Sequence, residues 1–184
     1  MAIEKVVIAG GGTMGSQIAF QIAYSGLYVT IYDVNPAASA AAKRRVATWD
    51  RIYMRERKAT PAVIKTTNDH LRYATDLETA VEDADLVIET VPEVVGVKNE
   101  FYAQLSKVAP QKTIFATSTS TLVPSQFAAI TGRPGKFLAL HFTNHVWVNH
   151  LAEVMGHPGT DPVVYQEVVA FVRRIGMIPI QLQQ

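Results

Sequence analysis

The chain contains no cysteine, no long apolar run and almost no excess of one charge. The absence of cysteine from all 184 residues excludes disulfides, thiolate catalysis and cysteine-ligated metals, and it fits a reducing compartment. No apolar run approaches the roughly 18 residues that a membrane-spanning helix needs. With 17 basic and 16 acidic side chains, the net charge of +1 argues against a general role on nucleic-acid or membrane surfaces. We therefore predict a cytoplasmic protein without nucleic-acid or membrane partners.

A glycine-rich motif follows the first apolar run of the chain. Residues 3–9 are mostly apolar and rich in β-branched side chains, as in a strand buried on both faces, and Gly10-x-Gly12-x-x-Gly15 comes directly after them. Gly10 permits a tight turn, Gly12 lets the backbone approach a pyrophosphate, and Gly15 lets helix and strand pack closely. Apolar residues at helical spacing over 14–25 place the unpaired donors of a helix N-terminus at that phosphate. This pattern predicts a dinucleotide-binding turn with cofactor contacts at Gly10, Gly12, Thr13, Met14 and Gly15.

Asp33 ends the second predicted strand, residues 27–32, and lies 18 residues past Gly15. Its carboxylate can accept hydrogen bonds from an adenosine ribose and would repel a 2′-phosphate. No arginine follows it in the segment 34–36, so we predict NAD rather than NADP as the cofactor. A doubly wound domain that holds another nucleotide, such as FAD, is the alternative.

The rest of the chain alternates strands with helices, which predicts a parallel sheet. A long helix from Pro36 to about Lys58 follows the second strand, and Thr60-Pro61 interrupts it. Further strands are predicted from about 71 and at 86–89, 113–117, 137–140, 151–155 and 177–182, with further helices near 76 and at 95–108 and 161–175. We predict one α/β domain, residues 1–184, with a Rossmann-like, doubly wound, mostly parallel sheet and a helical excursion after the second strand. A last strand with nothing after it suggests a fragment of a longer protein.

Four basic side chains share one stripe of the long helix. They follow one another at intervals of seven, four and three residues: Arg44, Arg51, Arg55 and Lys58. Such a stripe is typical of a solvated helix face, and it would also suit the anionic tail of a substrate.

His141 ends an apolar predicted strand, and Glu153 lies twelve residues later in the next one. A nicotinamide enzyme that oxidises an alcohol needs a base with a pKa near neutrality, which histidine provides. A carboxylate beside the ring would fix its tautomer and favour the imidazolium. Spacing alone leaves a structural histidine as the alternative. A zinc site is a further alternative, formed by His141, His145, His150 and Glu153, but no zinc-binding motif supports it and we predict no metal.

A run of hydroxyl side chains, residues 117–121, lies at the carboxyl end of another predicted strand. Open α/β sheets bind their ligands at this edge. We therefore expect these hydroxyls at the mouth of the site.

Four segments together resemble the NAD-binding domain of the 3-hydroxyacyl-CoA dehydrogenases, and they extend over nearly the whole chain. They are GGGTMGSQIA with Asp33, the Glu-Lys pair at 93 and 98, TSTSTL at 117–122, and HFTNHVWVNHLAEV at 141–154. The resemblance implies an NAD-dependent oxidoreductase of the hydroxybutyryl type, which acts in fatty acid metabolism. Hydride would move between NAD and C3 of a 3-hydroxyacyl-CoA or 3-oxoacyl-CoA.

The same resemblance implies roles for single residues. His141 would be the general base toward the 3-hydroxyl, and Glu153 would orient it. Ser120 would contact both substrate and nicotinamide. The further implied cofactor contacts are Glu93, Lys98 and Asn144. The basic helix would receive the CoA phosphates, with Arg51, Arg55 and Lys58 as substrate contacts.

The chain departs from the family pattern around the substrate. Ser118 replaces a usual Asn, His145 a usual Pro, and Asn149-His150 a usual Met-Lys pair. These changes leave open the acyl specificity and whether the substrate is a CoA thioester.

Members of this family continue into a second, helical domain, which supplies a catalytic Asn, closes the cleft and forms the dimer. We expect that helical C-terminal domain to be absent from this chain, and a homodimer to form through it in the whole protein. The alternatives are a β-hydroxyacid dehydrogenase acting on a free hydroxy acid, and a truncated NAD-binding module without turnover.

Overall fold

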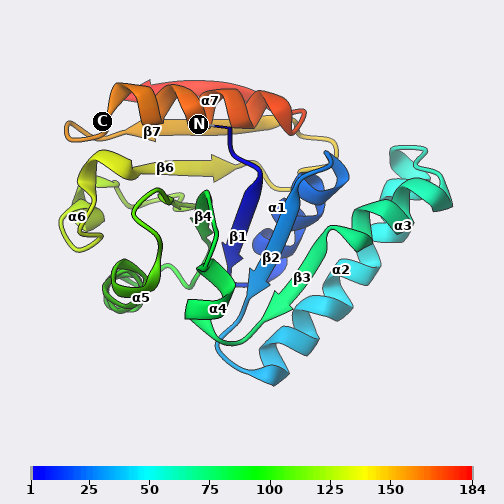
Figure 1. Ribbon diagram of the computed structural model, residues 1–184. Coiled ribbons are helices and arrows are strands. Elements are labelled where there is room, and N and C mark those ends of the chain that lie inside the picture. The colour runs from blue at the N-terminus through cyan, green and yellow to red at the C-terminus, as the bar shows by residue number, and fades with distance from the viewer. Residues whose placement is uncertain (1, 184) are drawn as a thin grey trace.

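Eight strands form one sheet in the order β3-β2-β1-β4-β5-β6-β7-β8, and helices cover both of its faces (Figure 1). The computed structural model describes residues 2–183. The strands are β1 (Lys5–Ala9), β2 (Tyr28–Tyr32), β3 (Leu71–Ala74), β4 (Leu86–Glu89), β5 (Ile114–Thr117), β6 (Phe137–Phe142), β7 (Leu151–Gly156) and β8 (Ile178–Gln183). The helices are α1 (Thr13–Tyr24), α2 (Pro36–Glu56), α3 (Pro61–Asp69), α4 (Leu77–Val81), α5 (Val95–Val108), α6 (Ser125–Ala128) and α7 (Pro162–Arg174), with one 3₁₀ turn, η1 (Pro134–Lys136).

All neighbouring strands of this sheet run parallel except β6 and β7. The central strands β1, β4 and β5 consist almost entirely of buried residues, as expected for a sheet covered on both faces. The predicted Rossmann-like, mostly parallel α/β fold is therefore confirmed. Among the described residues, no helix has both the length and the apolar character to cross a bilayer.

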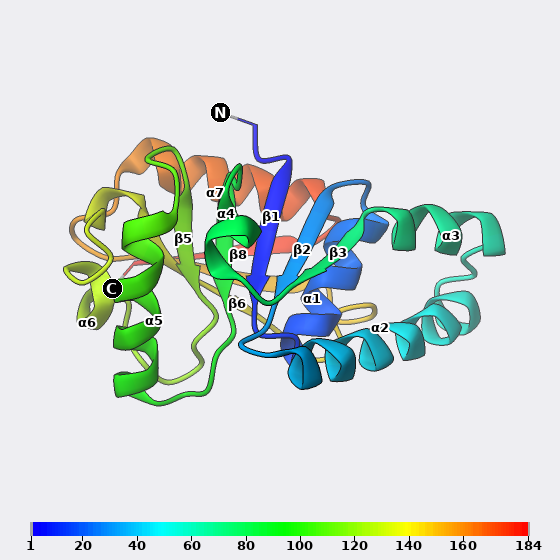
Figure 2. The ribbon, with the colours of Figure 1, turned by 60° about the horizontal axis from the view of Figure 1, so that its bottom comes forward.

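The helices divide between two cores, one on each face of the sheet (Figure 2). Helices α1, α2, α3 and α7 pack on one face, and α4, α5 and α6 pack on the other. Because side chains alternate along a strand, Glu89 and Thr117 point to the same face as Val87 and Phe115, beneath α5. Two polar side chains thus enter an otherwise apolar core at the carboxyl ends of β4 and β5.

The helical excursion after β2 consists of two helices. α2 ends at Glu56, slightly before the predicted end, and Lys58 takes a left-handed conformation with a φ of +57°. The predicted interruption at Thr60-Pro61 is also the start of α3, because Thr60 Oγ1 accepts the Val63 N–H at 3.3 Å and Pro61 occupies the first helical position.

Candidate active site

The turn between β1 and α1 presents open backbone where the motif predicts a phosphate. Gly10 has a φ of +108°, which favours glycine, and its N–H donates to Tyr32 O at 2.8 Å. A Cβ on Gly15 would lie 1.8 Å from Gly10 O, so α1 can start here only with glycine. A Cβ on Gly12, in contrast, would meet nothing within 4 Å. The space beside Gly12 is therefore free for a bound group.

α1 begins in this turn, and no side chain caps its N-terminus. The first turn of α1 also carries no acidic residue. Uncapped N–H groups and the positive end of the helix dipole favour an anion. The predicted contacts Gly12, Thr13 and Met14 all lie at this end.

Asp33 directs its carboxylate at the same turn. Its Oδ1 accepts the Gly11 N–H at 3.1 Å, while its Oδ2 is buried and has no hydrogen-bond partner. A buried acceptor without a partner is costly, and a ribose hydroxyl would satisfy it. Together with the open space at Gly12, this oxygen makes the residues fit an adenine dinucleotide.

His141 holds the other buried polar atom that lacks a partner. Within residues 2–183 only two buried side-chain polar atoms have none, and they are Asp33 Oδ2 and His141 Nδ1. Both belong to residues that the sequence predicts as functional, and both lie at the carboxyl edge of the parallel strands. Both unpartnered atoms of the described residues therefore lie at the sheet edge where α/β folds bind ligands.

The strand register places Glu153 directly opposite His141 in the antiparallel pair of β6 and β7. Opposed side chains of such a pair have Cβ atoms about 4.5–5.5 Å apart and project from the same face. Thr117, the last residue of β5, pairs with Ala139, two residues before His141, and the exposed Ser120 follows three residues after Thr117. The three predicted catalytic residues therefore come from adjoining strands at one edge.

The loop between β6 and β7 is fastened to α1 by the buried side chain of Gln17. Its Nε2 donates to Asn144 Oδ1 at 3.1 Å, and its Oε1 accepts the N–H groups of His145 and Val146 at 3.0 and 3.3 Å. Asn144, predicted as a cofactor contact, is thereby held beside the first turns of α1. Sequence reasoning missed Gln17, whose only signal is an amide inside an apolar helix.

Trp147 fastens the same loop to α2. Its ring lies 5.1 Å from that of Trp49, and its Nε1–H donates to Glu56. Arg57 donates to Trp147 O at 3.0 Å and contacts His150. Trp147 and His150, a position where the chain departs from the family pattern, therefore hold the loop between β6 and β7 against the end of α2.

Glu93 and Lys98, the predicted cofactor contacts from α5 and its entry, belong to a buried ionic network. Lys98 and Glu89 are both 0% exposed and form an ion pair at 2.7 Å, and Lys98 also lies 3.2 Å from Glu93. Burial raises the pKa of Glu93, but hydrogen bonds from Thr119 and the Lys98 charge outweigh it and hold the pKa below its usual range. Glu89 was not predicted, although an acid that closes the buried strand LVIE is a signal for it.

The predicted substrate contacts Arg51, Arg55 and Lys58 are exposed on or just after α2. Arg55 pairs with Glu56 at 2.6 Å, and Lys58 Nζ donates to Arg55 O at 3.1 Å. The opposite side of α2 carries the buried Val46 and Tyr53, as the helical spacing predicts. The stripe is thus open to solvent and to a ligand alike.

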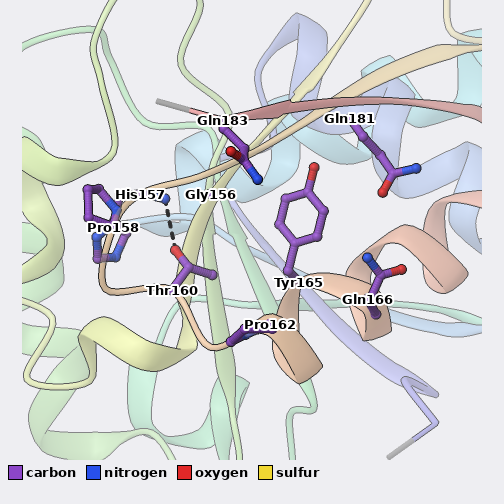
Figure 3. Close-up of a pocket in the computed structure, with 9 residues that line it drawn as sticks. All are labelled: Gly156, His157, Pro158, Thr160, Pro162, Tyr165, Gln166, Gln181 and Gln183. Atoms are coloured by element: carbon purple, nitrogen blue, oxygen red, sulfur yellow. Dashed lines mark hydrogen bonds between the residues drawn. The ribbon is translucent and has the colours of Figure 1, made fainter.

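A cavity of about 700 Å³ lies elsewhere (Figure 3). Tyr165, Gln181 and Gln183 line it, at the carboxyl end of β7 and β8. β7 runs antiparallel to β6, so this cavity opens at the sheet edge opposite the glycine-rich turn. Among residues 2–183 no three His, Asp or Glu side chains gather as metal ligands, so the zinc set considered above does not form.

The sequence profile of the 3-hydroxyacyl-CoA dehydrogenase NAD binding domain matches residues 5–184. A probable 3-hydroxybutyryl-CoA dehydrogenase of Bacillus subtilis is 34% identical over 182 residues, which are 99% of this chain and 63% of that protein. A 5-formyl-3-hydroxy-2-methylpyridine 4-carboxylate 5-dehydrogenase of Mesorhizobium japonicum is 30% identical over 182 residues, 99% of this chain and 58% of that protein.

Among solved structures, a diketoreductase described in substrate-directed dual catalysis of dicarbonyl compounds superposes with a TM-score of 0.97. It is 51% identical in sequence, and the match covers 99% of this chain and 65% of that one. The chain thus spans about three fifths of the length of the curated relatives that it matches.

Proposed function

The chain belongs to the 3-hydroxyacyl-CoA dehydrogenase family through its NAD-binding domain, and from this premise we propose that its site moves hydride between NAD and C3 of a 3-hydroxyacyl or 3-oxoacyl substrate. The observation that carries the proposal is the pair of unsatisfied buried atoms, Asp33 Oδ2 and His141 Nδ1. Asp33 Oδ2 can accept a hydrogen bond from a ribose hydroxyl. The His141 ring, whose Nδ1 has no protein partner, can take up the proton of the 3-hydroxyl. The site offers both at the edge where such sheets bind ligands.

The residues that would hold NAD follow the carboxyl ends of β1, β2 and β4, except Asn144, which comes from the loop after β6. The proposed contacts are Gly10, Gly12, Thr13, Met14, Gly15, Asp33, Glu93, Lys98 and Asn144. Backbone donors at the start of α1 would bind the pyrophosphate, and Asp33 would bind the adenosine ribose. When bound, NAD supplies a hydride acceptor. Every other part of the reaction falls to the side chains around it.

His141 would act as the general base. As the C3–H bond breaks and its electron pair leaves as hydride, the 3-hydroxyl oxygen forms the new carbonyl and its proton passes to the imidazole. Glu153, opposite on β7, would stabilise the resulting imidazolium and fix the ring orientation. Ser120 would orient the substrate oxygen from the loop after β5. In the reverse direction the imidazolium returns its proton to the forming alcohol.

Two substrate classes compete for this site. Family membership and the exposed cations Arg51, Arg55 and Lys58 favour a CoA thioester, whose phosphates these side chains would bind. The 51% identity to a diketoreductase favours a free dicarbonyl compound as the second candidate.

The substrate class can be measured with the full-length protein. We expect NADH oxidation with acetoacetyl-CoA, and a fall in that rate when Arg51 and Arg55 are both replaced by alanine. The exposed Arg44, on the same stripe but farther from the loop, provides the matched control as Arg44→Ala. Reduction of a free β-diketone or 3-oxo acid, with no response to acetoacetyl-CoA, would establish the second candidate instead.

The remaining expectations concern the whole protein. We propose that residues 1–184 act as one NAD-binding domain, although Met1 and Gln184 lie outside the described residues. Dimerisation through a helical second domain, a cytoplasmic location and a role in fatty acid metabolism stay predictions. Light scattering on the full-length protein would measure whether it dimerises.

A further inference from the structure

An ion pair is wholly buried beneath the candidate site. Glu89 Oε1 accepts from Lys98 Nζ at 2.7 Å and from the Val91 N–H at 2.8 Å. Glu89 Oε2 accepts from Lys98 Nζ, Tyr102 Oη and Thr117 Oγ1, at 2.9, 3.0 and 2.8 Å. Burial raises the pKa of Tyr102 well above its usual value, so its hydroxyl stays a neutral donor. Five hydrogen bonds from four donor groups saturate this carboxylate.

Lys98 joins this pair to Glu93. Its Nζ directs donors at both oxygens of Glu89 and lies 3.2 Å from Glu93 Oε2. An ammonium group has three donors, and these three oxygens use all of them. Within this network Lys98 connects the buried Glu89 to Glu93, whose side chain is 36% exposed.

The other oxygen of Glu93 binds both neighbours of Ser120. Glu93 Oε1 accepts from Thr119 Oγ1 and, at 3.1 Å, from Thr121 Oγ1. Thr119 Oγ1 in turn accepts the Leu122 N–H at 3.0 Å. The loop that presents Ser120 is thus clamped on either side by one carboxylate.

The sheet register connects the network to His141. Glu89 pairs with Thr117, and Thr117 pairs with Ala139, two residues before His141. Glu89, Thr117 and His141 consequently point to the same face from three successive strands. A shift of the network would move the Ser120 loop relative to His141.

A buried ion pair of this kind is poorly explained by stability. Desolvation of two charges offsets most of their attraction, and well-packed apolar residues of the same size are often as stable or more so. What such a pair does provide is a fixed geometry, because each group must keep its partners.

We infer that Glu89 is a positioning residue: with Lys98 it fixes Glu93, and through Thr119 and Thr121 it holds Ser120 in place toward the substrate. This inference rests on the proposed function for Ser120. The contacts themselves do not depend on which acyl compound is the substrate.

The test compares the variants Lys98→Met, Glu89→Gln and the double variant Glu89→Gln/Lys98→Met in the full-length protein. Lys98→Met alone leaves a buried unpaired carboxylate, so its Tm should fall. The double variant has no buried charge, so it should regain most of that Tm. Lys107→Met, which removes an exposed charge from the same helix, is the matched control and should behave as wild type.

Two measurements on the double variant then separate positioning from stability. Amide hydrogen exchange over residues 117–123 should rise above wild type, because Thr119 and Thr121 lose their fixed acceptor. At saturating NADH, which removes the effect of any weaker cofactor binding through Lys98, kcat should fall about 10- to 100-fold while the KM of the acyl substrate changes little. This is the result expected when a group touching the reacting atoms is misplaced.

Wild-type exchange over this segment in the double variant would overturn the inference, as would wild-type kcat. If the unmodified protein reduces neither acyl-CoA nor dicarbonyl compounds, the proposed function fails, but the exchange measurement still decides whether Glu89 orders the loop.

Discussion

At the scale of single residues, Asp33 and His141 each carry an atom that the fold leaves without a partner. One carboxylate oxygen of Asp33 accepts the Gly11 N–H, and the other has no hydrogen-bond partner. Hydrogen bonds to charged groups are worth about 1.5–3 kcal/mol, so a ribose diol bound here gains much of its affinity from one side chain.

Asp33→Asn tests this role, because the amide keeps an acceptor for Gly11 and removes the charge. We expect NADH affinity to fall roughly tenfold or more, while NADPH gains relative to NADH because the repulsion of its 2′-phosphate disappears. Fluorescence titration with both nucleotides measures the ratio of NADH affinity to NADPH affinity. Asp69→Asn, an exposed acid paired with Lys65 on α3, should leave it unchanged. An unaltered NADH to NADPH ratio in Asp33→Asn would refute the assignment.

At this scale the sequence reveals residues whose type is unusual for their position in a predicted strand or helix. Asp33 follows a predicted strand and His141 ends one. Both can be recognised in the sequence because a polar side chain interrupts an apolar run. Glu89 and Gln17 escape notice, since their importance comes from partners that are distant in sequence: Glu89 bonds Thr117, and Gln17 bonds the loop at Asn144. Only the folded chain brings those partners together.

At the scale of elements, the turn between β1 and α1 distinguishes a glycine needed for packing from one needed for binding. Gly15→Ala should lower the stability by about 2–3 kcal/mol, because its Cβ would press on Gly10 O. Gly12→Ala should fold with an almost unchanged Tm, since its Cβ meets no protein atom, yet lose most NADH affinity. Thermal denaturation and NADH titration on both variants measure this. Tight NADH binding by Gly12→Ala would show that the open space is not the pyrophosphate site.

The loop between β6 and β7 depends on α1 for its position. Gln17→Leu removes the acceptor of the His145 and Val146 N–H groups and the donor to Asn144. We expect kcat/KM to fall about tenfold through the displaced loop, with a smaller change in NADH affinity. Gln104→Leu, an exposed glutamine on α5, is the control. If both variants turn over like wild type, the loop does not need this anchor.

Element boundaries follow local chemistry, and the sequence reveals them where that chemistry is strong. Thr60-Pro61 indicates that the preceding helix is interrupted. Whether a new helix begins there depends on the burial of Ile64 and Thr67 in the core. The reversed direction of β7 is likewise set by the short connection from β6 and by packing against α7. In both cases the packing depends on residues distant in sequence, which local patterns do not reveal.

At the scale of the whole molecule, the carboxylates that bind across the fold make stability depend on pH. Asp85 Oδ2 accepts the N–H groups of Glu4 and Lys5 at 2.9 and 3.0 Å, and Oδ1 pairs with Lys112. Burial raises the pKa of Asp85, but the Lys112 charge and the two N–H groups outweigh it and hold the pKa below its ordinary 3.8.

A carboxyl group with a lowered folded-state pKa stabilises the fold above its unfolded pKa, and this contribution is lost as the pH falls through the folded value. We therefore expect Tm to decline as the pH drops below about 4. Asp85→Asn should have a lower Tm at pH 7 and a shallower decline in acid. Parallel Tm curves for the variant and wild type would show that Asp85 contributes nothing to acid sensitivity.

The alternation of strands and helices predicts the Rossmann-like sheet, because each buried apolar strand needs helices on both faces. The same reasoning does not place β3, β2 and β1 beside β4, nor bring Glu153 opposite His141. Strand order and register come from long-range packing, and the family resemblance supplies here what local patterns lack.

We propose that this site couples NADH to a 3-oxoacyl group through His141. The most direct measurement is the rate of NADH oxidation by acetoacetyl-CoA for the full-length protein and its His141→Gln variant, together with NADH affinity for both. We expect turnover by the wild type, a loss of about 10²–10⁴-fold in kcat for the variant, and nearly equal NADH affinity. Equal kcat values would contradict it, because the proton would then have another route.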